Sequence, residues 1–323
     1  AMGGDRAPGE IVEGAREAAS PTLAPILFGP AGLATGGLEL IETHGVVEMH
    51  EKPAEAVRAK PDSSLVAACR AVGEGRADAI VSAGNTGAML AACFVELRRL
   101  PGVMRPAIAV PIPTERGPSV LIDAGANADN RPEHLLQFAH MGTVFAEEIL
   151  GLVNPEVRLL SIGEEPEKGN QLTLEAHALL AESGLNFAGN AESRDLLAGA
   201  ADVVVCDGFT GNIALKTAEG VAELVARLLR EEIIHGGFRA KIGALLMKKA
   251  FRGLKRRTDP AEYGGALLLG VDGVCVICHG SSRAYAVANA IRVARDAVAG
   301  NYIALIRECV AHGESVRPES EAG

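Results

Sequence analysis

The stretch that decides the fold is residues 202–212, Asp202-Val203-Val204-Val205-Cys206-Asp207-Gly208-Phe209-Thr210-Gly211-Asn212. Its apolar first half is typical of a strand that is buried on both faces. The second half is rich in glycine and small polar residues, and a helical pattern follows over 212–234. The stretch therefore predicts a strand, a tight turn and a helix, the unit from which parallel sheets are built.

The same unit occurs five times along the chain. Besides Cys206-Asp207-Gly208-Phe209-Thr210-Gly211-Asn212, the turns read Val81-Ser82-Ala83-Gly84-Asn85-Thr86-Gly87, Asp123-Ala124-Gly125-Ala126-Asn127, Ser161-Ile162-Gly163 with Lys168-Gly169-Asn170, and Cys278-His279-Gly280-Ser281-Ser282. Because the carboxyl ends of parallel strands meet at one edge of a sheet, we expect all five turns to line one crevice. Backbone N–H groups and helix N-termini would face that crevice, so the pattern predicts chemistry on phosphate or a similar small anion.

Strands and helices alternate through the middle of the chain. The expected pairs are 77–83 with 86–100, 119–124 with 132–150, 156–162 with 172–182, 202–206 with 212–234, and 273–278 with 283–299. Ahead of them we expect strands over 22–28 and 38–41, helices over 53–58 and 63–73, and a loop over 30–37. This pattern predicts an α/β fold of three layers with a mostly parallel sheet, forming one catalytic domain over 1–323, and a frayed polar tail over 312–323.

Composition excludes several classes of protein. The chain has 323 residues, 48% of them hydrophobic, which is enough to bury a large core. Its formal net charge is −10, with no Trp and three Tyr, so it has neither the basic surface nor the aromatic platforms of a nucleic-acid-binding protein. We therefore expect no nucleic-acid partner.

The compartment is inferred from the cysteines and from the absence of targeting patterns. Six cysteines are scattered through apolar segments rather than clustered as a disulfide framework, which favours a reducing cytoplasm. The sequence shows neither a signal-peptide pattern nor eighteen uninterrupted apolar residues. Because the opening residues Gly3-Gly4-Asp5 are turn-like, we expect a strand to precede Ala1.

One basic segment interrupts the acidic chain. Residues 238–257 carry eight Lys or Arg and no acid, interleaved with apolar residues at helical spacing. We predict a protruding amphipathic helix within an insertion over 235–262, which contacts an anionic membrane or an acidic partner protein. A solvated helix packed on its own protein is the alternative. The predicted contact residues are Ile242, Leu246, Lys248, Lys249, Phe251 and Arg252.

The turns supply the candidate site residues. Glycines allow the backbone to approach a ligand closely, and the small polar residues can bind an anion or cap a helix. The candidates for binding phosphate or substrate are Gly84, Asn85, Thr86, Asn127, Asn170, Asp207, Thr210, Gly211 and Asn212. The candidate catalytic residues are Lys168, Lys216 and His279. A helix cap, a surface lysine, an ion pair with the acids at 164–167 and a structural histidine are the alternatives.

Other site signatures are absent or fail on physical grounds. Cys275-Val276-Ile277-Cys278-His279 has the spacing of covalent haem attachment, but the two cysteines of a strand at this spacing point to opposite faces. The sequence has no second Cys or His pair at zinc-ligand spacing, and no G-x-S-x-G, G-x-x-x-x-G-K-[ST] or G-x-G-x-x-G motif. We therefore expect no metal and no cofactor.

Taken together and in order, the motifs resemble one family along nearly the whole chain. The matching stretches are 1–5 with 7–8, 82–88, 105–107, 121–127, 162–165 with 168–169, 205–212 with 215–217, 263–270 and 279–282. They resemble the bacterial phosphate acyltransferase (PlsX) family. The match departs at the start, where the family's first strand and its aspartate are absent, and over 30–42.

The resemblance implies an acyltransferase that moves a long fatty acyl chain from acyl carrier protein to inorganic phosphate. The product, acyl phosphate, would serve a glycerol-3-phosphate acyltransferase in phospholipid synthesis. It also implies a fold like phosphotransacetylase and isopropylmalate dehydrogenase, a homodimer, and a cytoplasmic enzyme attached peripherally to the inner face of the membrane. The alternatives are a decarboxylating dehydrogenase on the related fold and a membrane-surface scaffold without catalysis.

The residues fit the implied reaction. Phosphate is itself the nucleophile, so the site needs only to hold it against the thioester. Asn85, Thr86, Thr210 and Asn212 are candidates for holding it, Lys168 or Lys216 for polarising the carbonyl, and His279 for protonating the leaving thiolate.

Overall fold

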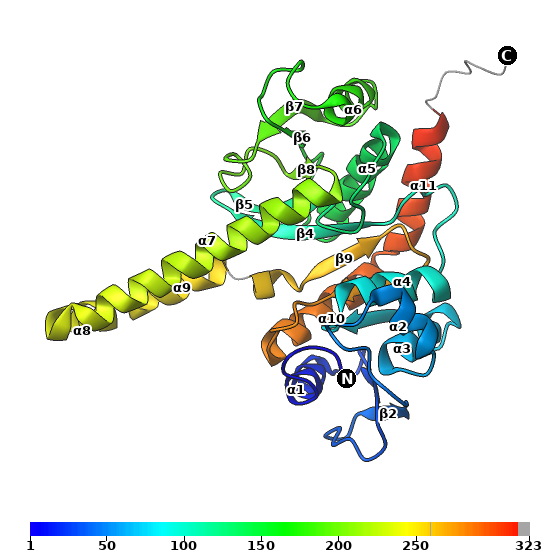
Figure 1. Cartoon of the computed structure of the whole chain (residues 1–323), viewed down its shortest axis with the longest axis vertical. Helices are drawn as coiled ribbons and strands as arrows, with labels where there is room; N and C mark the ends of the chain where they lie inside the picture. The colour runs from blue at the N-terminus through cyan, green and yellow to red at the C-terminus, as the bar shows by residue number, and fades with distance from the viewer. Residues whose placement is uncertain (259, 316–323) are drawn as a thin grey trace.

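The computed structural model describes residues 1–258 and 260–315, and it places an eight-stranded sheet between two layers of helices (Figure 1). The strand order is β3-β10-β9-β4-β5-β8-β6-β7. The bounds of these strands are β3 Ala79–Ser82, β4 Ala107–Thr114, β5 Gly117–Ile122, β6 Val157–Ser161, β7 Phe187–Glu192, β8 Val203–Val205, β9 Ala266–Leu269 and β10 Val274–Ile277. Two further strands, β1 Ile26–Gly29 and β2 Glu39–Glu42, form a separate parallel pair.

The helices follow the strands closely. Their bounds are α1 Gly9–Ala18, α2 Pro53–Ala59, α3 Ser64–Gly73, α4 Thr86–Glu96, α5 Pro132–Glu148, α6 Gln171–Ala181, α7 Gly208–His235, α8 Gly237–Leu246, α9 Lys248–Thr258, α10 Ala284–Ala299 and α11 Tyr302–Ser315, with a short 3-10 turn at Pro260–Tyr263. Of the tail expected to fray, residues 312–315 continue α11, and 316–323 lie outside the described residues.

The central strands are buried on both faces, as their apolar runs predict. In β5, Val120 and Ile122 pack in one core while Leu121 packs in the other. The first core lies against α5, α6, α10 and α11, and the second lies against α2, α3, α4 and the start of α7. Alternate side chains therefore bind the sheet to both helix layers, since successive residues of a strand point to opposite faces.

The three-layer α/β fold with a mostly parallel sheet is confirmed, but the single crevice is wrong. Strands β5, β8, β6 and β7 run parallel to one another, and β3 runs parallel to β10. Between these groups lie three antiparallel pairings, β10 with β9, β9 with β4 and β4 with β5. After three reversals the two groups of strands run in opposite directions. The carboxyl ends of β3 and β10 therefore lie at the edge of the sheet opposite to the carboxyl ends of β5, β6 and β8, and so do the turns that follow them.

A helical arm projects from this body (Figure 1). The 28-residue helix α7 leads outward from the sheet, α8 forms the tip, and α9 returns toward the sheet beside α7. Helix α7 begins at Gly208 rather than at residue 212, because Asp207 caps it. The basic segment predicted as one helix is two, since α8 ends at Leu246 and α9 begins at Lys248.

Other differences from the expected elements concern short or antiparallel segments. The sequence pattern did not predict α1, β4, β7, β9 or α11. The predicted strands, helices and the loop at 30–37 are present, with ends that shift by a few residues. Among the residues that the structure describes, no helix is both long enough and apolar enough to cross a bilayer.

Close packing of α1 on α10 gives a test of the N-terminal region. A Cβ at Gly14 would lie 2.5 Å from the Ala284 carbonyl oxygen and 2.6 Å from Val287 Cβ, whereas a Cβ at Gly9 meets nothing within 4 Å. We expect Gly14→Ala to lower the free energy of unfolding by about 1–3 kcal/mol through overpacking. Gly9→Ala, on the same helix, is the matched control and leaves it unchanged or slightly higher. Urea denaturation of both variants checks this, and equal midpoints would contradict it.

Candidate active site

The carboxylate of Asp123, directly after β5, organises the turn that follows it. The residue is fully buried. Its Oδ1 accepts hydrogen bonds from the backbone N–H groups of Ile108, Gly125 and Ala126, at 2.9–3.1 Å. Its Oδ2 accepts from the backbone nitrogen and the side-chain amide of Asn127, both at 2.8 Å. Five donors on one carboxylate fix the shape of the loop 123–127.

Burial and hydrogen bonding act on Asp123 in opposite directions. Burial disfavours the charged form and raises the pKa of the carboxyl, while the donors from Ala126, Ile108, Asn127 and Gly125 lower it. The net pKa lies above the ordinary value for aspartate. The fold therefore tolerates a costly buried acid here, because the acid supplies acceptors that this loop needs.

Two glycines let α7 begin directly against this loop. A Cβ at Gly208 would lie 2.5 Å from the Asn127 carbonyl oxygen and 2.7 Å from Asp123 Oδ2, and a Cβ at Gly211 would collide with the Asp123 carbonyl oxygen. The Gly208 N–H also donates to the Asn127 carbonyl at 2.9 Å. Glycine is required at both positions because backbone meets backbone there.

The first turn of α7 is capped from within. Asp207 Oδ1 accepts from the Thr210 N–H at 2.8 Å, and the Thr210 hydroxyl donates to Asp207 Oδ2 at 2.7 Å. Asp207 thus acts as an N-cap with a negative charge that favours the helix dipole. The polar groups of these two predicted ligands are bonded to each other.

Asn212 and Lys168 differ from their neighbours because the polar groups of their side chains have no hydrogen bond or ion pair with another described residue. Both are exposed. Asn212 lies one turn into α7 and faces the loop after β5, with its side chain about 3.4 Å from the Cβ position of Gly125. Lys168 stands in the turn after β6, the strand beside β8. The two side chains are free to bind a ligand at the shared edge of β5, β8 and β6.

The other candidates at this edge have their side chains engaged. Asn170 caps α6 by accepting from the Thr173 N–H at 2.9 Å. Asn127 donates to Asp123 and to the Pro106 carbonyl. The Lys216 ammonium lies 2.7 Å from Glu219 on the same helix, so part of its charge is neutralised there. The side chains of these residues therefore stabilise the local structure around Lys168 and Asn212.

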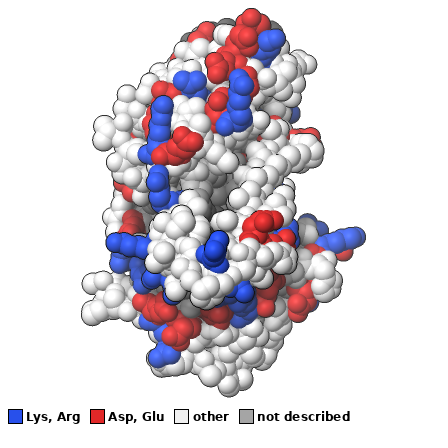
Figure 2. All heavy atoms as spheres, turned by 90° about the vertical axis from the view of Figure 1, so that its left-hand side faces the viewer, with Lys and Arg blue, Asp and Glu red and all other residues white. Residues whose placement is uncertain are grey.

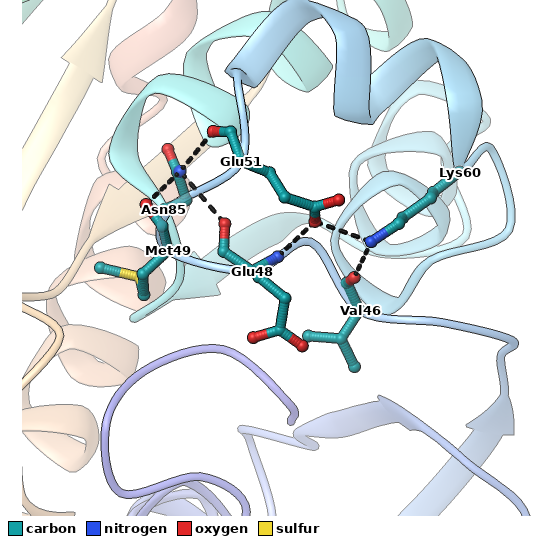
Figure 3. Close-up of polar contacts among 6 residues, drawn as sticks. All are labelled: Val46, Glu48, Met49, Glu51, Lys60 and Asn85. Atoms are coloured by element: carbon teal, nitrogen blue, oxygen red, sulfur yellow. Dashed lines mark hydrogen bonds and ion pairs between the residues drawn. The ribbon is translucent and has the colours of Figure 1, made fainter.

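At the opposite edge, Asn85 ties a loop to the start of α4 (Figure 3). Its Oδ1 caps the helix by accepting from the Ala88 N–H, and its amide nitrogen lies within 3.0–3.4 Å of the carbonyl oxygens of Glu48, Met49 and Glu51. The neighbouring candidates are Gly84, which is buried, and Thr86, which is exposed. Asn85 is therefore engaged on both sides of its amide.

The loop that Asn85 holds is closed by an ion pair. Lys60 donates to Glu51 Oε2 at 2.7 Å and to the Val46 carbonyl, and the Glu48 N–H donates to the same carboxylate oxygen (Figure 3). The hydrogen bond from Lys60 is the largest cause that lowers the pKa of Glu51. Sequence analysis missed this loop, because no local motif marks residues 46–51.

His279 lies at the same edge as Asn85. It is exposed, and its Nδ1 accepts from the Ser281 N–H at 3.2 Å and contacts the Ser281 hydroxyl at 2.8 Å. The next residue, Gly280, accepts from the Asp5 N–H at 2.8 Å, and Gly3 packs directly on Gly84. Of the three predicted catalytic residues, His279 is thus separated by the sheet from Lys168 and Lys216.

The cysteines and the acidic side chains form no cluster for a metal ion in the described part of the chain. No group of three or more His, Cys, Asp and Glu there has the geometry to hold a metal ion. Cys275 packs in one core and Cys278 in the other, which is the opposite-face arrangement expected of a strand. All six cysteines are free thiols, and burial raises the pKa of Cys278 to about 12.

The fold is that of the phosphotransacetylases. Solved phosphotransacetylases from Streptococcus pyogenes and Staphylococcus aureus (EutD) superpose with TM-scores of 0.60 and 0.58 at 17% and 16% identity, each covering 89–90% of this chain and 91% of the other. A 4-hydroxythreonine-4-phosphate dehydrogenase from Klebsiella pneumoniae reaches a TM-score of 0.50 at 13% identity, over 90% of this chain and 93% of its own. These likenesses show the fold alone.

Sequence comparison defines the family. The model of the family described as "Fatty acid synthesis protein" matches residues 1–305. The phosphate acyltransferase of Heliobacterium modesticaldum is 49% identical over 95% of both chains, and that of Pelotomaculum thermopropionicum is 49% identical over 100% of this chain and 96% of its own. The chain belongs to the phosphate acyltransferase family, and it is an enzyme that transfers an acyl group to phosphate.

The role of Asp123 is testable with a near-isosteric change. In Asp123→Asn one acceptor oxygen becomes an amide donor that faces N–H groups, so buried donors lose their partner. We expect the free energy of unfolding to fall by about 2 kcal/mol or more, and acyl phosphate formation to fall with it. Asp129→Asn, an exposed change in the adjoining segment, should stay within about 0.5 kcal/mol. Thermal melts and activity assays check both, and a fully stable, active Asp123→Asn would refute the assignment.

Proposed function

We propose that the enzyme transfers a long-chain fatty acyl group from acyl carrier protein to inorganic phosphate, and that Lys168 and Asn212 form its reaction site. The observation that carries this site is that the polar groups of these two side chains are unengaged among the candidates at the β5, β6 and β8 edge. The acyl phosphate produced would be the substrate of a glycerol-3-phosphate acyltransferase in phospholipid synthesis. The scaffold and dehydrogenase alternatives are set aside by the family to which the chain belongs.

The reaction assigns a task to each side chain. A phosphate oxygen attacks the thioester carbonyl, a C–O bond forms, and the C–S bond breaks to release the carrier's thiolate. The Lys168 ammonium attracts the phosphate and the developing oxyanion. The Asn212 amide donates a hydrogen bond either to the phosphate or to the oxyanion. The leaving thiolate takes its proton from Lys168 or from solvent, since His279 lies at the other edge of the sheet.

Mutation of the pair tests the site. We expect Asn212→Ala and Lys168→Met each to lower acyl phosphate formation on the order of 100-fold, without loss of stability, because both side chains are exposed and unbonded. Hydroxylamine trapping of acyl phosphate from acyl carrier protein and phosphate measures it. Glu223→Gln, an exposed change further along α7, is the control. Full activity in both site variants would remove the pair from the site.

The arm supports a second proposal, that it contacts an anionic membrane surface from the cytoplasm. Its tip exposes large apolar side chains, with Leu246 at 80%, Phe238 at 78% and Leu245 at 68%. Among the predicted contact residues, Ile242, Lys248, Lys249 and Arg252 are also exposed, whereas Phe251 is half-buried. Figure 2 looks onto the end of the arm, where a largely uncharged surface has Lys and Arg side chains on it and beside it, with acidic side chains also nearby. Apolar insertion and attraction to anionic lipid act together on such a surface.

The middle of α7 supports the proposal of a homodimer. Val221, Leu224, Val225, Leu228 and Leu229 recur at helical spacing and are 43–58% exposed. A stripe of this kind on a soluble helix is typical of a face that packs against another helix. A second copy of α7 provides the same stripe, so the contact is self-complementary.

The membrane proposal is tested at the tip of the arm. We expect Leu246→Glu to weaken flotation with phosphatidylglycerol vesicles about tenfold, since burying one leucine contributes about 1.5–3 kcal/mol. Val153→Glu is the matched control, because Val153 is an apolar residue that is 93% exposed outside the arm. Retained turnover on soluble acyl carrier protein would assign the tip to the membrane, whereas lost turnover would assign it to the carrier. Unchanged flotation would contradict the proposal.

A further inference from the structure

Three large apolar side chains are exposed at the edge of the sheet where the proposed reaction site lies. Ile162 is 81% exposed, Phe209 61% and Ile213 50%. Ile162 directly follows β6, and the other two lie at the start of α7, which follows β8. Because β6 and β8 are paired in parallel, with Leu159 opposite Val205, both turns leave the sheet at the same edge. A single exposed apolar side chain is ordinary, but three at one edge indicate a surface that binds something apolar.

The start of α7 has one packed face and one exposed face. Gly208 and Gly211 are buried against the loop after β5, and Ala214 and Leu215 pack on the core below the sheet. The exposed face carries, in order, Phe209, Asn212, Ile213, Lys216 and Thr217. Polar and apolar side chains therefore share a single solvent-facing side of the helix.

Helical geometry places Asn212 at the border between these two faces. A helix turns by about 100° per residue, so Asn212 lies about 60° to one side of Phe209 and Ile213 lies about 40° to the other. The side chain of Asn212 approaches Gly125 in the loop after β5. Phe209 and Ile213 are neighbours on the helix surface, because they are four residues apart. A group held by the Asn212 amide thus has a backbone turn on one side and two apolar side chains on the other.

The acyl group that this enzyme transfers needs a surface of this kind. Its carbonyl is polar and belongs at the reaction site, but its hydrocarbon chain leaves the carbonyl carbon at once and is costly to expose to water. The loop at 123–127 carries no large apolar side chain. Phe209 and Ile213 offer apolar area directly beside Asn212, so the chain is better placed along α7 than along the loop.

A second copy of the chain is the competing occupant of this surface, and the position of the apolar stripe on α7 argues against it. The stripe from Val221 to Leu229 is centred about 100° around the helix from Phe209 and Ile213. Lys216 and Gly220 interrupt the apolar pattern between the two sets. The two surfaces are therefore separate, and contact through the stripe leaves the start of α7 available for substrate.

We propose that Phe209 and Ile213, with Ile162 from the neighbouring turn, bind the first part of the acyl chain and make the enzyme selective for long chains. The inference rests on the proposed transfer of a long-chain acyl group beside Asn212. A longer chain covers more of this surface than a short one, so the transition state gains apolar contact as the chain lengthens. The three side chains are specificity determinants rather than participants in bond making.

The ratio of kcat/KM for palmitoyl to that for butyryl acyl carrier protein tests the proposal. We expect Phe209→Ala to lower this ratio about tenfold through lost apolar contact, and Phe209→Leu to restore most of it. Phe94→Ala is the matched control, because Phe94 is 48% exposed on α4 and lies outside α7. Hydroxylamine trapping measures the acyl phosphate formed from each substrate. Phe209 is exposed, so its replacement should not prevent folding.

The outcomes separate the occupants. An unchanged ratio in Phe209→Ala and in the double variant with Ile213→Ala would overturn the proposal. Equal losses with both substrates would also overturn it, since the side chains would then contact the carrier and not the acyl chain. A shift from dimer to monomer in sedimentation would assign the pair to a second copy instead. Asn212→Ala should lower both activities without changing the ratio, so failure of the reaction site is distinguished from failure of the acyl surface.

Discussion

The buried carboxylate of Asp123 is the constraint around which the proposed reaction site is built. It collects five N–H groups from the start of β4 and from its own turn. That turn accepts the first residues of α7 only because Gly208 and Gly211 have no side chain. The position of Asn212 thus follows from an acid that is separated from α7 by five elements of the sequence. A charge that is costly to bury is retained because each of its lone pairs has a donor.

The reversal of strand direction at the centre of the sheet divides the glycine-rich turns into two groups. Lys168 and Asn212 belong to one group, and Asn85 and His279 to the other. Within each group most polar side chains are bonded to their own backbone, as caps or loop ties. The proposed reaction site is therefore distinguished by two unbonded polar side chains at one edge of the sheet rather than by the number of motifs there.

Much of the fold could be predicted from local pattern, because strands such as Val203–Val205 are apolar on both faces and end in turn residues. Strands β4 and β9 could not, since Pro111 and Pro113 in β4 and the short Ala266–Leu269 give weak strand signals. Their antiparallel pairing joins residues that are far apart in the sequence, and it decides which glycine-rich turns lie at the same edge of the sheet. Candidate site residues can be chosen by residue type, but the hydrogen bonds and ion pairs of their side chains cannot be predicted, because a partner such as Glu219 or Ser281 is identified only in three dimensions.

Helix α7 has a mechanical consequence, since it begins at the proposed reaction site and continues without a break into the arm. From Asn212 to Ile234 the helix rises by 22 residue steps, or about 33 Å at 1.5 Å per step. An unbroken helix is stiff over this length, so any surface that seats the far end also sets the height and tilt of Asn212 above it. If the arm seats on a membrane as proposed, it works as a spacer of fixed length, and the proposed carrier protein would have to deliver its thioester within the space that this length sets.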